Sequence, residues 1–254
     1  MKRAILLLAL LAAPALAQTA GTYDPSLDRK RYDGCVRAIP TDAKKAEQFA
    51  IEWQGMGGGL PARHCQALAL MQQQQFTAAA STLSKAAQQA EVEKSPLAAD
   101  FWSQAGNAAF LAGDNMGAVG YFTTALKSAG EFAPQRTANI LLDRARTYTD
   151  MRDFVAARAD LDKALQLNKF DPVAWMLSAA LARRQGDIGR ASTDIARAST
   201  LDSANPDILF EQGNVAAANK DEANARKLWE MTVKSAPGSP AAELAAKALA
   251  ENKP

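Results

Sequence analysis

Three stretches of the sequence decide the fold of this chain: 153–164 (DFVAARADLDKA), 187–198 (DIGRASTDIARA) and 221–232 (DEANARKLWEMT). Each begins with an aspartate, carries an alanine four residues later and a large apolar residue four residues after that. Spacings of three and four place apolar side chains on one face of a helix. The alanines act as anchors of the pattern and stand 34 residues apart. They are Ala157, Ala191 and Ala225.

Two further copies of this pattern come earlier, at intervals of 39 residues, with anchors at Ala118 and Ala79. A small residue stands 12 positions before every anchor. In chain order these small residues are Ala67, Gly106, Ala145, Ala179 and Gly213. Two antiparallel helices approach closely where one has a small residue and the other an alanine, and a large neighbour fills the remaining space. The pattern therefore predicts five helix-turn-helix units.

The series resembles the tetratricopeptide repeat, a unit of about 34 residues with a Trp, Gly, Tyr, Ala, Phe, Ala and Pro pattern. The best unit has Trp102, Gly106, Ala118, Phe122 and Ala125 at the matching positions. The resemblance implies an all-α fold, a right-handed α-solenoid of about five repeats closed by a C-terminal capping helix. Repeat arrays need such a polar outer helix at their ends for solubility.

The N-terminus has the order of a secretory signal peptide. Lys2 and Arg3 precede an apolar run over 4–13, and Ala17 ends an Ala-x-Ala cleavage site. An uncleaved anchor helix is the alternative, but the run is shorter than the ~20 residues that cross a bilayer. We expect cleavage after Ala17 and export to the periplasm. We divide the chain into a signal peptide (1–17), a flexible leader (18–40), an N-terminal helix with a glycine-rich loop (41–59), the repeats (60–237) and the capping helix (238–254).

Charge argues against a nucleic-acid partner. The chain has 29 Lys and Arg against 27 Asp and Glu, and loss of Lys2 and Arg3 leaves 27 of each sign. Binding to a phosphate backbone calls for a basic patch. After the signal, no run is apolar and long enough to span a membrane. The loop 55–59 invites a phosphate-binding interpretation, but no Gly-Lys-Ser/Thr follows, and a sharp turn between helices explains its glycines.

Two cysteines, Cys35 and Cys65, are the only ones in the chain. In an exported protein an even number of cysteines predicts a disulfide. The alternative is a nucleophilic Cys65 served by the only histidine, His64. Adjacent helical residues point about 100° apart, which separates a base from its nucleophile. We therefore expect a Cys35–Cys65 bridge, and a surface position for His64.

The inventory of side chains does not favour an enzyme. No carboxylates stand at a recognisable ligand spacing, and Asp160 and Asp162 are expected to be solvated. We expect no cofactor and no metal. The resemblance implies a scaffold that binds a protein or peptide in the bacterial envelope, in an assembly, secretion or division complex. An architectural module that forms homo-oligomers, or a Cys/His enzyme, are the alternatives, and the oligomeric state stays open.

The resemblance also implies where a peptide would bind, because the concave wall of such arrays is formed by the first helix of each unit. In four of the units a large residue stands four positions before the small one; these residues are Trp102, Leu141, Trp175 and Leu209. The resemblance places groove residues one and five positions after this large residue, and in neighbouring turns. The candidate groove residues are Ser103, Asn107, Phe110, Leu142, Arg146, Met176, Arg183, Phe210 and Asn214. The competing interpretation is that these are merely solvated helix positions.

Overall fold

A computed structural model describes residues 24–130 and 133–252 of the chain, and within these ranges every regular element is helical. The elements are η1 (Pro25–Leu27), α1 (Asp28–Ala38), α2 (Ala43–Gly55), α3 (Gly59–Gln72), α4 (Phe76–Val92), α5 (Ala98–Leu111), α6 (Asn115–Ser128), α7 (Pro134–Asp150), α8 (Phe154–Leu167), α9 (Pro172–Arg184), α10 (Ile188–Leu201), α11 (Pro206–Ala218), α12 (Glu222–Ser235) and α13 (Pro240–Glu251).

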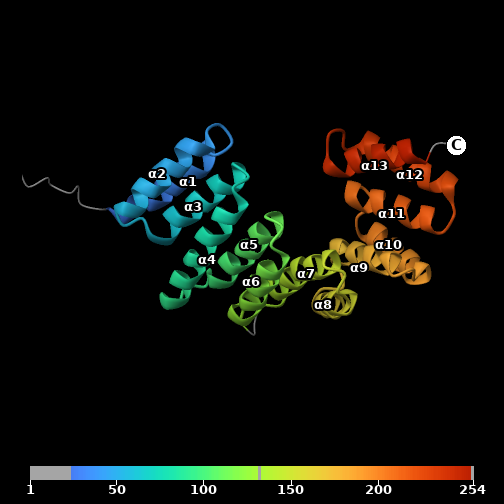
Figure 1. Ribbon diagram of the computed structural model, residues 1–254, viewed down its shortest axis with the longest axis horizontal. Helices are drawn as coiled ribbons and strands as arrows, with labels where there is room; N and C mark the ends of the chain where they lie inside the picture. The colour runs from blue at the N-terminus through green and yellow to red at the C-terminus, as the bar shows by residue number, and fades with distance from the viewer. Residues whose placement is uncertain (1–23, 131–132, 253–254) are drawn as a thin grey trace, which may run out of the picture.

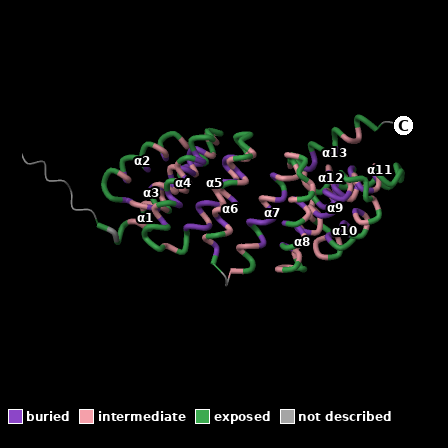
Figure 2. The backbone as a smooth tube through the Cα atoms, turned by 60° about the horizontal axis from the view of Figure 1, so that its bottom comes forward, coloured by how far each residue is buried: buried purple, intermediate pink, exposed green. Residues whose placement is uncertain are grey.

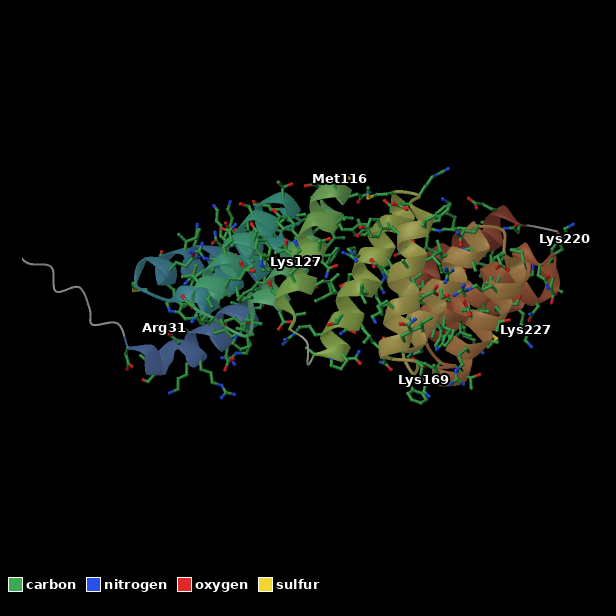
Figure 3. All side chains as sticks on the ribbon, turned by 90° about the horizontal axis from the view of Figure 1, so that it is seen from below. Arg31, Met116, Lys127, Lys169, Lys220 and Lys227 are labelled. Carbon is green, nitrogen blue, oxygen red and sulfur yellow. A yellow bond between two sulfur atoms is a disulfide. The ribbon has the colours of Figure 1, made fainter. Side chains whose placement is uncertain are left out.

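The helices stack in sequence order into an open arch (Figure 1). Helices α5, α7 and α9 lie on the inner side of the arch, and α6 and α8 lie on the outer side. Buried residues follow the seams between helices, while exposed residues follow the turns (Figure 2). In Figure 3, which views the arch from its outer side, Met116 and Lys169 lie at opposite edges of the stack. The fold is the all-α solenoid of repeats that the sequence predicts.

The packing logic of the repeats is confirmed at the anchors. Ala118, Ala157 and Ala191 are each 0% exposed. At Gly106 an added Cβ would lie 2.6 Å from Cε1 of Phe122, and at Gly213 it would lie 2.5 Å from Cδ1 of Trp229. Such distances are well inside van der Waals contact, so the aromatic rings occupy the space that glycine leaves. Glycine at these two positions therefore permits the close approach of α5 to α6 and of α11 to α12.

Helix starts are fixed by caps that recur with the repeats. The side chains of Asp153 and Asp187 accept hydrogen bonds from the backbone N–H groups of residues three positions later, at the starts of α8 and α10. Asp171 and Asn205 cap α9 and α11, each directly before a proline at the first helical position. A proline there loses no helical hydrogen bond, since the first N–H groups have no partner within the helix. Ser239 caps α13 in the same way.

The N-terminal region differs from the expectation of a flexible leader over 18–40. Residues 28–38 form α1, and its Cys35 is 3% exposed. Cys35 packs with Ala46 and Ala50 of α2, so α1 and α2 add a short helix pair in front of the five predicted ones. The side chain of Asp42 caps α2 by accepting a hydrogen bond from the backbone N–H of Lys45. Because most residues of α1 are charged or polar, its sequence has no apolar periodicity that would predict a helix. The signal peptide and its cleavage site lie outside the described residues.

No helix in the described part of the chain has both the length and the apolar character needed to span a bilayer.

Candidate functional site

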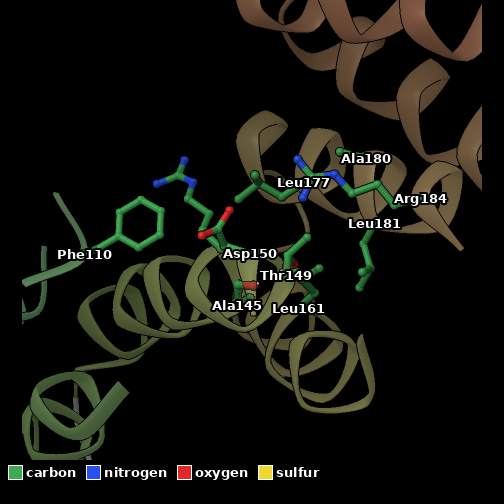
Figure 4. Close-up of a pocket in the computed structure, with 10 residues that line it drawn as sticks. Phe110, Ala145, Thr149, Asp150, Leu161, Leu177, Ala180, Leu181 and Arg184 are labelled. Carbon is green, nitrogen blue, oxygen red and sulfur yellow. Dashed lines mark hydrogen bonds between the residues drawn. The ribbon is translucent and has the colours of Figure 1, made fainter. Parts of the chain in front are cut away.

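The inner side of the arch carries a pocket of about 220 Å³ between α5, α7, α8 and α9. Phe110 lies on one side of it, and Leu177, Ala180 and Arg184 lie on the other (Figure 4). The full lining is Phe110, Ala145, Arg146, Thr149, Asp150, Leu161, Leu177, Ala180, Leu181 and Arg184. Three successive repeats contribute to it through their first helices.

Helical spacing explains why these side chains meet. Arg146 and Asp150 are four residues apart on α7, and Ala180 and Arg184 are four apart on α9. Residues at this spacing share one helix face. Arg146 is exposed, and its Nη1 lies 2.9 Å from Oδ1 of Asp143. The pocket thus combines an apolar base with charged groups of both signs at its edge.

Comparison with known families decides what this stack of helices is. The model of the tetratricopeptide repeat matches residues 66–135, 142–199 and 177–240, which together cover most of the chain. The chain belongs to the tetratricopeptide-repeat family. Stacked repeats of this kind offer extended surfaces to other proteins. The protein is therefore a tetratricopeptide-repeat scaffold for protein–protein interaction.

Solved structures share the fold at low identity. PilF from Pseudomonas aeruginosa is 14% identical, with a TM-score of 0.61 over 89% of this chain and 99% of that one. The apo form of the quorum sensor NprR from B. thuringiensis is 12% identical, with a TM-score of 0.67 over 89% and 70%. BtubC from P. vanneervenii is 17% identical, with a TM-score of 0.60 over 91% and 95%. Among curated proteins, no sequence matches.

The tetratricopeptide-repeat structure brings only part of the predicted groove together. Phe110 and Arg146 line the pocket. Asn107 lies beside it in the array, where its Nδ2 donates to Oδ2 of Asp143 at 3.2 Å. Ser103 is half-buried and does not line the pocket.

One apolar member of the predicted set, Leu142, belongs to the core, which corrects its sequence-based assignment. Leu142 is only 6% exposed. Met176 packs against the core between α9 and α11, and Phe210 packs against the core between α11 and α13. These three residues follow directly after the large residue of their repeat. Leu142 is therefore withdrawn from the groove, whereas Met176 and Phe210 are half-buried and do not line the pocket.

Arg183, another predicted groove residue, forms its contacts within the stack of helices. Nε and Nη2 of Arg183 donate to the two carboxylate oxygens of Glu211, at 2.7 and 3.0 Å. Nδ2 of Asn214 donates to the same carboxylate at 3.0 Å. Glu211 is only 6% exposed, so this cluster ties α9 to α11. Arg183 and Asn214 stabilise the stack, and the neighbouring Arg184 reaches the pocket instead.

Sequence reasoning missed Thr149, Asp150, Leu177, Ala180 and Arg184, all of which line the pocket. A signal for most of them was present. Ala180 stands five residues after Trp175, the same offset that correctly selects Arg146 after Leu141. Continuing one turn along the same face leads to Asp150 and Arg184. In α7 and α9, residues five and nine positions after the large residue therefore line the pocket.

A second, larger pocket of about 590 Å³ lies nearer the N-terminus, between α1, α3 and α5. His64 lies in its wall and is half-buried, which corrects the expected surface position. Nε2 of His64 lies 2.8 Å from Oε1 of Gln104, and Nδ1 lies 2.8 Å from the hydroxyl of Tyr32. Because the amide oxygen only accepts, Nε2 carries the hydrogen and Nδ1 accepts from Tyr32. Burial lowers the pKa of His64 below its ordinary value.

The predicted disulfide between Cys35 and Cys65 is present and joins α1 to α3. It uses both cysteines of the chain, so no thiol is left for a nucleophilic role. In the glycine-rich loop, Gly57 and Gly59 have φ of 98° and 51°, the left-handed region that glycine favours. A Cβ at Gly58 would lie 2.6 Å from the Trp53 ring. Within the described residues, no cluster of three or more His, Cys, Asp and Glu has metal-site geometry.

Proposed function

We propose that this protein is an exported scaffold that holds an extended segment of a partner polypeptide along the inner side of the arch. The pocket between α5, α7 and α9 carries the proposal, because three consecutive repeats converge on it. Its volume of about 220 Å³ is below that of typical small-molecule pockets, roughly 300–1,000 Å³, and suits a single side chain. A partner bound there contacts several repeats at once.

The chemistry of the pocket suggests the kind of segment it holds. Phe110 and Leu177, both half-buried, offer apolar contact to one side chain of the partner. Arg146 and Arg184 bring two guanidinium groups to the edge; Arg146 pairs with Asp143 at 2.9 Å, and Asp150 adds a carboxylate to the lining. Guanidinium groups pair with carboxylates through charge-assisted hydrogen bonds. The preferred segment therefore has an apolar residue next to an acidic one.

The proposed compartment is the bacterial periplasm, and the proposed setting is an assembly, secretion or division complex of the envelope. The N-terminal sequence to Ala17 supports export. The disulfide is consistent with an oxidising compartment. Protein purified from its native host is expected to have the intact mass of a chain that begins at Gln18. A mass that retains Met1 would refute cleavage at this site.

The test of the groove begins with a partner captured from the native envelope and identified by mass spectrometry. Its affinity is then measured for Ala180→Glu, which places a charge in the pocket, and for Ala156→Glu on the outer helix α8. Both alanines are half-buried, so the two variants are matched. We expect Ala180→Glu to weaken binding at least tenfold, about 1.4 kcal/mol, and Ala156→Glu to leave it unchanged. Equal affinities would place the binding surface elsewhere.

An architectural module without a peptide ligand makes a different prediction. Its mass in light scattering would rise with protein concentration and would not change when envelope extract is added. The enzyme alternative required a reactive thiol beside His64, and Cys65 is bonded to Cys35. We therefore propose no catalytic role for this pair.

A further inference from the structure

The larger N-terminal pocket is built differently from the central one. Its volume is about 590 Å³, and it lies between the first helices of two repeats, α3 and α5, and the additional helix α1. The apolar part of its wall comes from Tyr32, Leu60, Pro61, Leu97 and Phe101. Leu97 is 45% exposed, and Pro61 is exposed as well, so the pocket opens to solvent.

The polar groups of this pocket bond to one another. Both ring nitrogens of His64 are used, by Tyr32 and by Gln104. Oδ1 of Asp100 lies 2.9 Å from Nε of Arg136. Because these donors and acceptors already have partners, a ligand gains little by offering more hydrogen bonds there. The wall is therefore suited to an apolar group.

The charged side chains at the rim of this pocket sum to a small positive net charge. Asp28 pairs with Arg31 at 3.2 Å and accepts a hydrogen bond from Nε1 of Trp53 at 3.3 Å. Arg29, on the same helix, is exposed at the edge of the pocket. Counting Asp100 with Arg136, each rim carboxylate has its own guanidinium and Arg29 adds one more positive charge. A basic residue beside the apolar group is therefore disfavoured.

The pocket is also fixed in shape before a ligand arrives. The Cys35–Cys65 disulfide and the Tyr32–His64 hydrogen bond both tie α1 to α3. The Gln104 contact extends the chain of bonds to α5. A preformed wall loses little conformational entropy on binding. Helix α1 lies outside the residues that match the repeat family, so this wall is an addition to the repeats.

Helix α5 contributes residues to both pockets. Gln104 lines the N-terminal pocket, Phe110 lines the central pocket, and Asn107 stands between them at spacings of three residues. Six residues of helix rise roughly 9 Å along the axis. An extended chain covers that distance with about three residues, at roughly 3.3 Å each. A segment held in the central pocket therefore reaches the N-terminal one.

We propose that the N-terminal pocket binds a large, uncharged aromatic or aliphatic side chain of the same partner polypeptide. This inference rests on the proposed function, because the occupant belongs to the segment held in the central pocket. The volume of about 590 Å³ accommodates the largest side chains. The disulfide-bonded helix α1 thereby selects partners that carry such a residue a few positions away from the central contact.

His64 provides a direct test, since it is the only histidine in the chain. Its ring resonances in NMR report on this pocket alone. The probes are two capped tripeptides, N-acetyl-Gly-Trp-Gly-amide and N-acetyl-Gly-Ser-Gly-amide, titrated into the full chain. We expect the Trp peptide to shift the His64 ring signals saturably and the Ser peptide to leave them unchanged. Absence of a saturable shift, or equal shifts with both peptides, would overturn the proposal.

Two matched variants identify the site. Leu97→Lys adds a charge at the pocket, whereas Leu244→Lys makes the same change on α13, where Leu244 is 52% exposed. We expect Leu97→Lys to weaken binding of the Trp peptide at least fivefold and Leu244→Lys to have no effect. Circular dichroism confirms that both variants remain folded. If Leu97→Lys binds the peptide as the wild type does, the pocket is not the site.

The results of this experiment and of the groove experiment are independent, so each can reject its own proposal. The titration needs no natural partner, so a failure of Ala180→Glu to affect partner binding leaves the His64 result intact. Conversely, a silent His64 with a sensitive Ala180→Glu would reject the N-terminal pocket alone. If a neutral apolar molecule such as dodecanol shifts His64 and the Trp peptide does not, the occupant is a small molecule and the peptide proposal is wrong.

Discussion

The hydroxyl of Tyr32 donates a hydrogen bond of 2.8 Å to Nδ1 of His64, and the two rings stack with centroids 5.8 Å apart. Tyr32 belongs to α1 and His64 to the first repeat, 32 residues later. Phe101 of the second repeat also contacts the imidazole, edge to face, with ring centroids 5.3 Å apart. A single neutral imidazole therefore joins three helices at the N-terminal end of the array.

We expect the free energy of unfolding to decrease as the pH is lowered, because of this imidazole. Burial lowers the pKa of His64 below its ordinary value, about 6.5. As the pH drops below that value, the unfolded chain binds a proton that the folded chain resists, so the free energy of unfolding decreases. Urea unfolding at about pH 7.5 and about pH 5 should therefore show a larger loss for the wild type than for His64→Gln. Identical losses would mean that His64 is not the cause.

The disulfide is expected to contribute most of the stability of the N-terminal end. It closes a loop with a sequence separation of 30 residues. The chain-entropy model gives about 3–4 kcal/mol for such a loop. A Cys35→Ala, Cys65→Ala double variant should lose about this much in urea unfolding, and its His64 ring signals should move. Alkylation of the denatured, unreduced wild type should add no label; labelling at two sites would contradict the bridge.

The repeats could be predicted from the sequence because their determinants are local. Ala118, Phe122 and Gly106 stand at fixed offsets, and each offset reflects one contact between paired helices that recurs in every unit. Each further copy of the pattern at the same offsets supports the assignment of the other copies. The caps at Asp171 and Asn205 are equally local, because a side chain reaches only the next turn of backbone.

The N-terminal helix and the composition of the groove could not be predicted in this way. They depend on contacts between units, and no short sequence pattern indicates those contacts. Helix α1 contains charged residues over most of its length, and it is helical here because Cys35 and Tyr32 bind distant residues of α3. Leu142 belongs to the core because the adjacent repeat covers it. Which positions a neighbour covers depends on the rotation from one repeat to the next, and offsets within a single unit do not determine that rotation.

Substitution of the anchors should separate sealed from open positions. Ala157 is 0% exposed, whereas Ala223 is exposed at the start of α12. Ala157→Leu inserts volume into a packed seam and should cost about 1–3 kcal/mol. Ala223→Leu should cost less than about 0.5 kcal/mol. Thermal or urea unfolding of the two variants measures the difference, and equal effects would show that the helix register is wrong.

The Arg144–Asp160 pair is an interaction of the core, although the sequence suggests a solvated Asp160. Nε and Nη2 of Arg144 donate to the two oxygens of Asp160 at 2.7 and 2.8 Å, and Asp160 is only 6% exposed. The hydrogen bonds to Asp160 raise the pKa of Arg144. Because a guanidinium group keeps its proton in proteins, Arg144 stays charged when Asp160 is removed. A charge left without its partner in such a place is costly, because neither water nor a counter-ion replaces the lost bonds.

We therefore expect a strongly non-additive result from a double-mutant cycle on this pair. Asp160→Leu alone should cost about 3 kcal/mol, since it strands the guanidinium of Arg144. The double variant with Arg144→Met should recover most of that loss, because two apolar side chains of similar size pack in the same place. The exposed pair Lys247–Glu251 serves as the control. Glu251→Ala there should cost less than about 1 kcal/mol. Urea unfolding measures all four variants, and additive losses at Arg144 and Asp160 would show that the two side chains act independently.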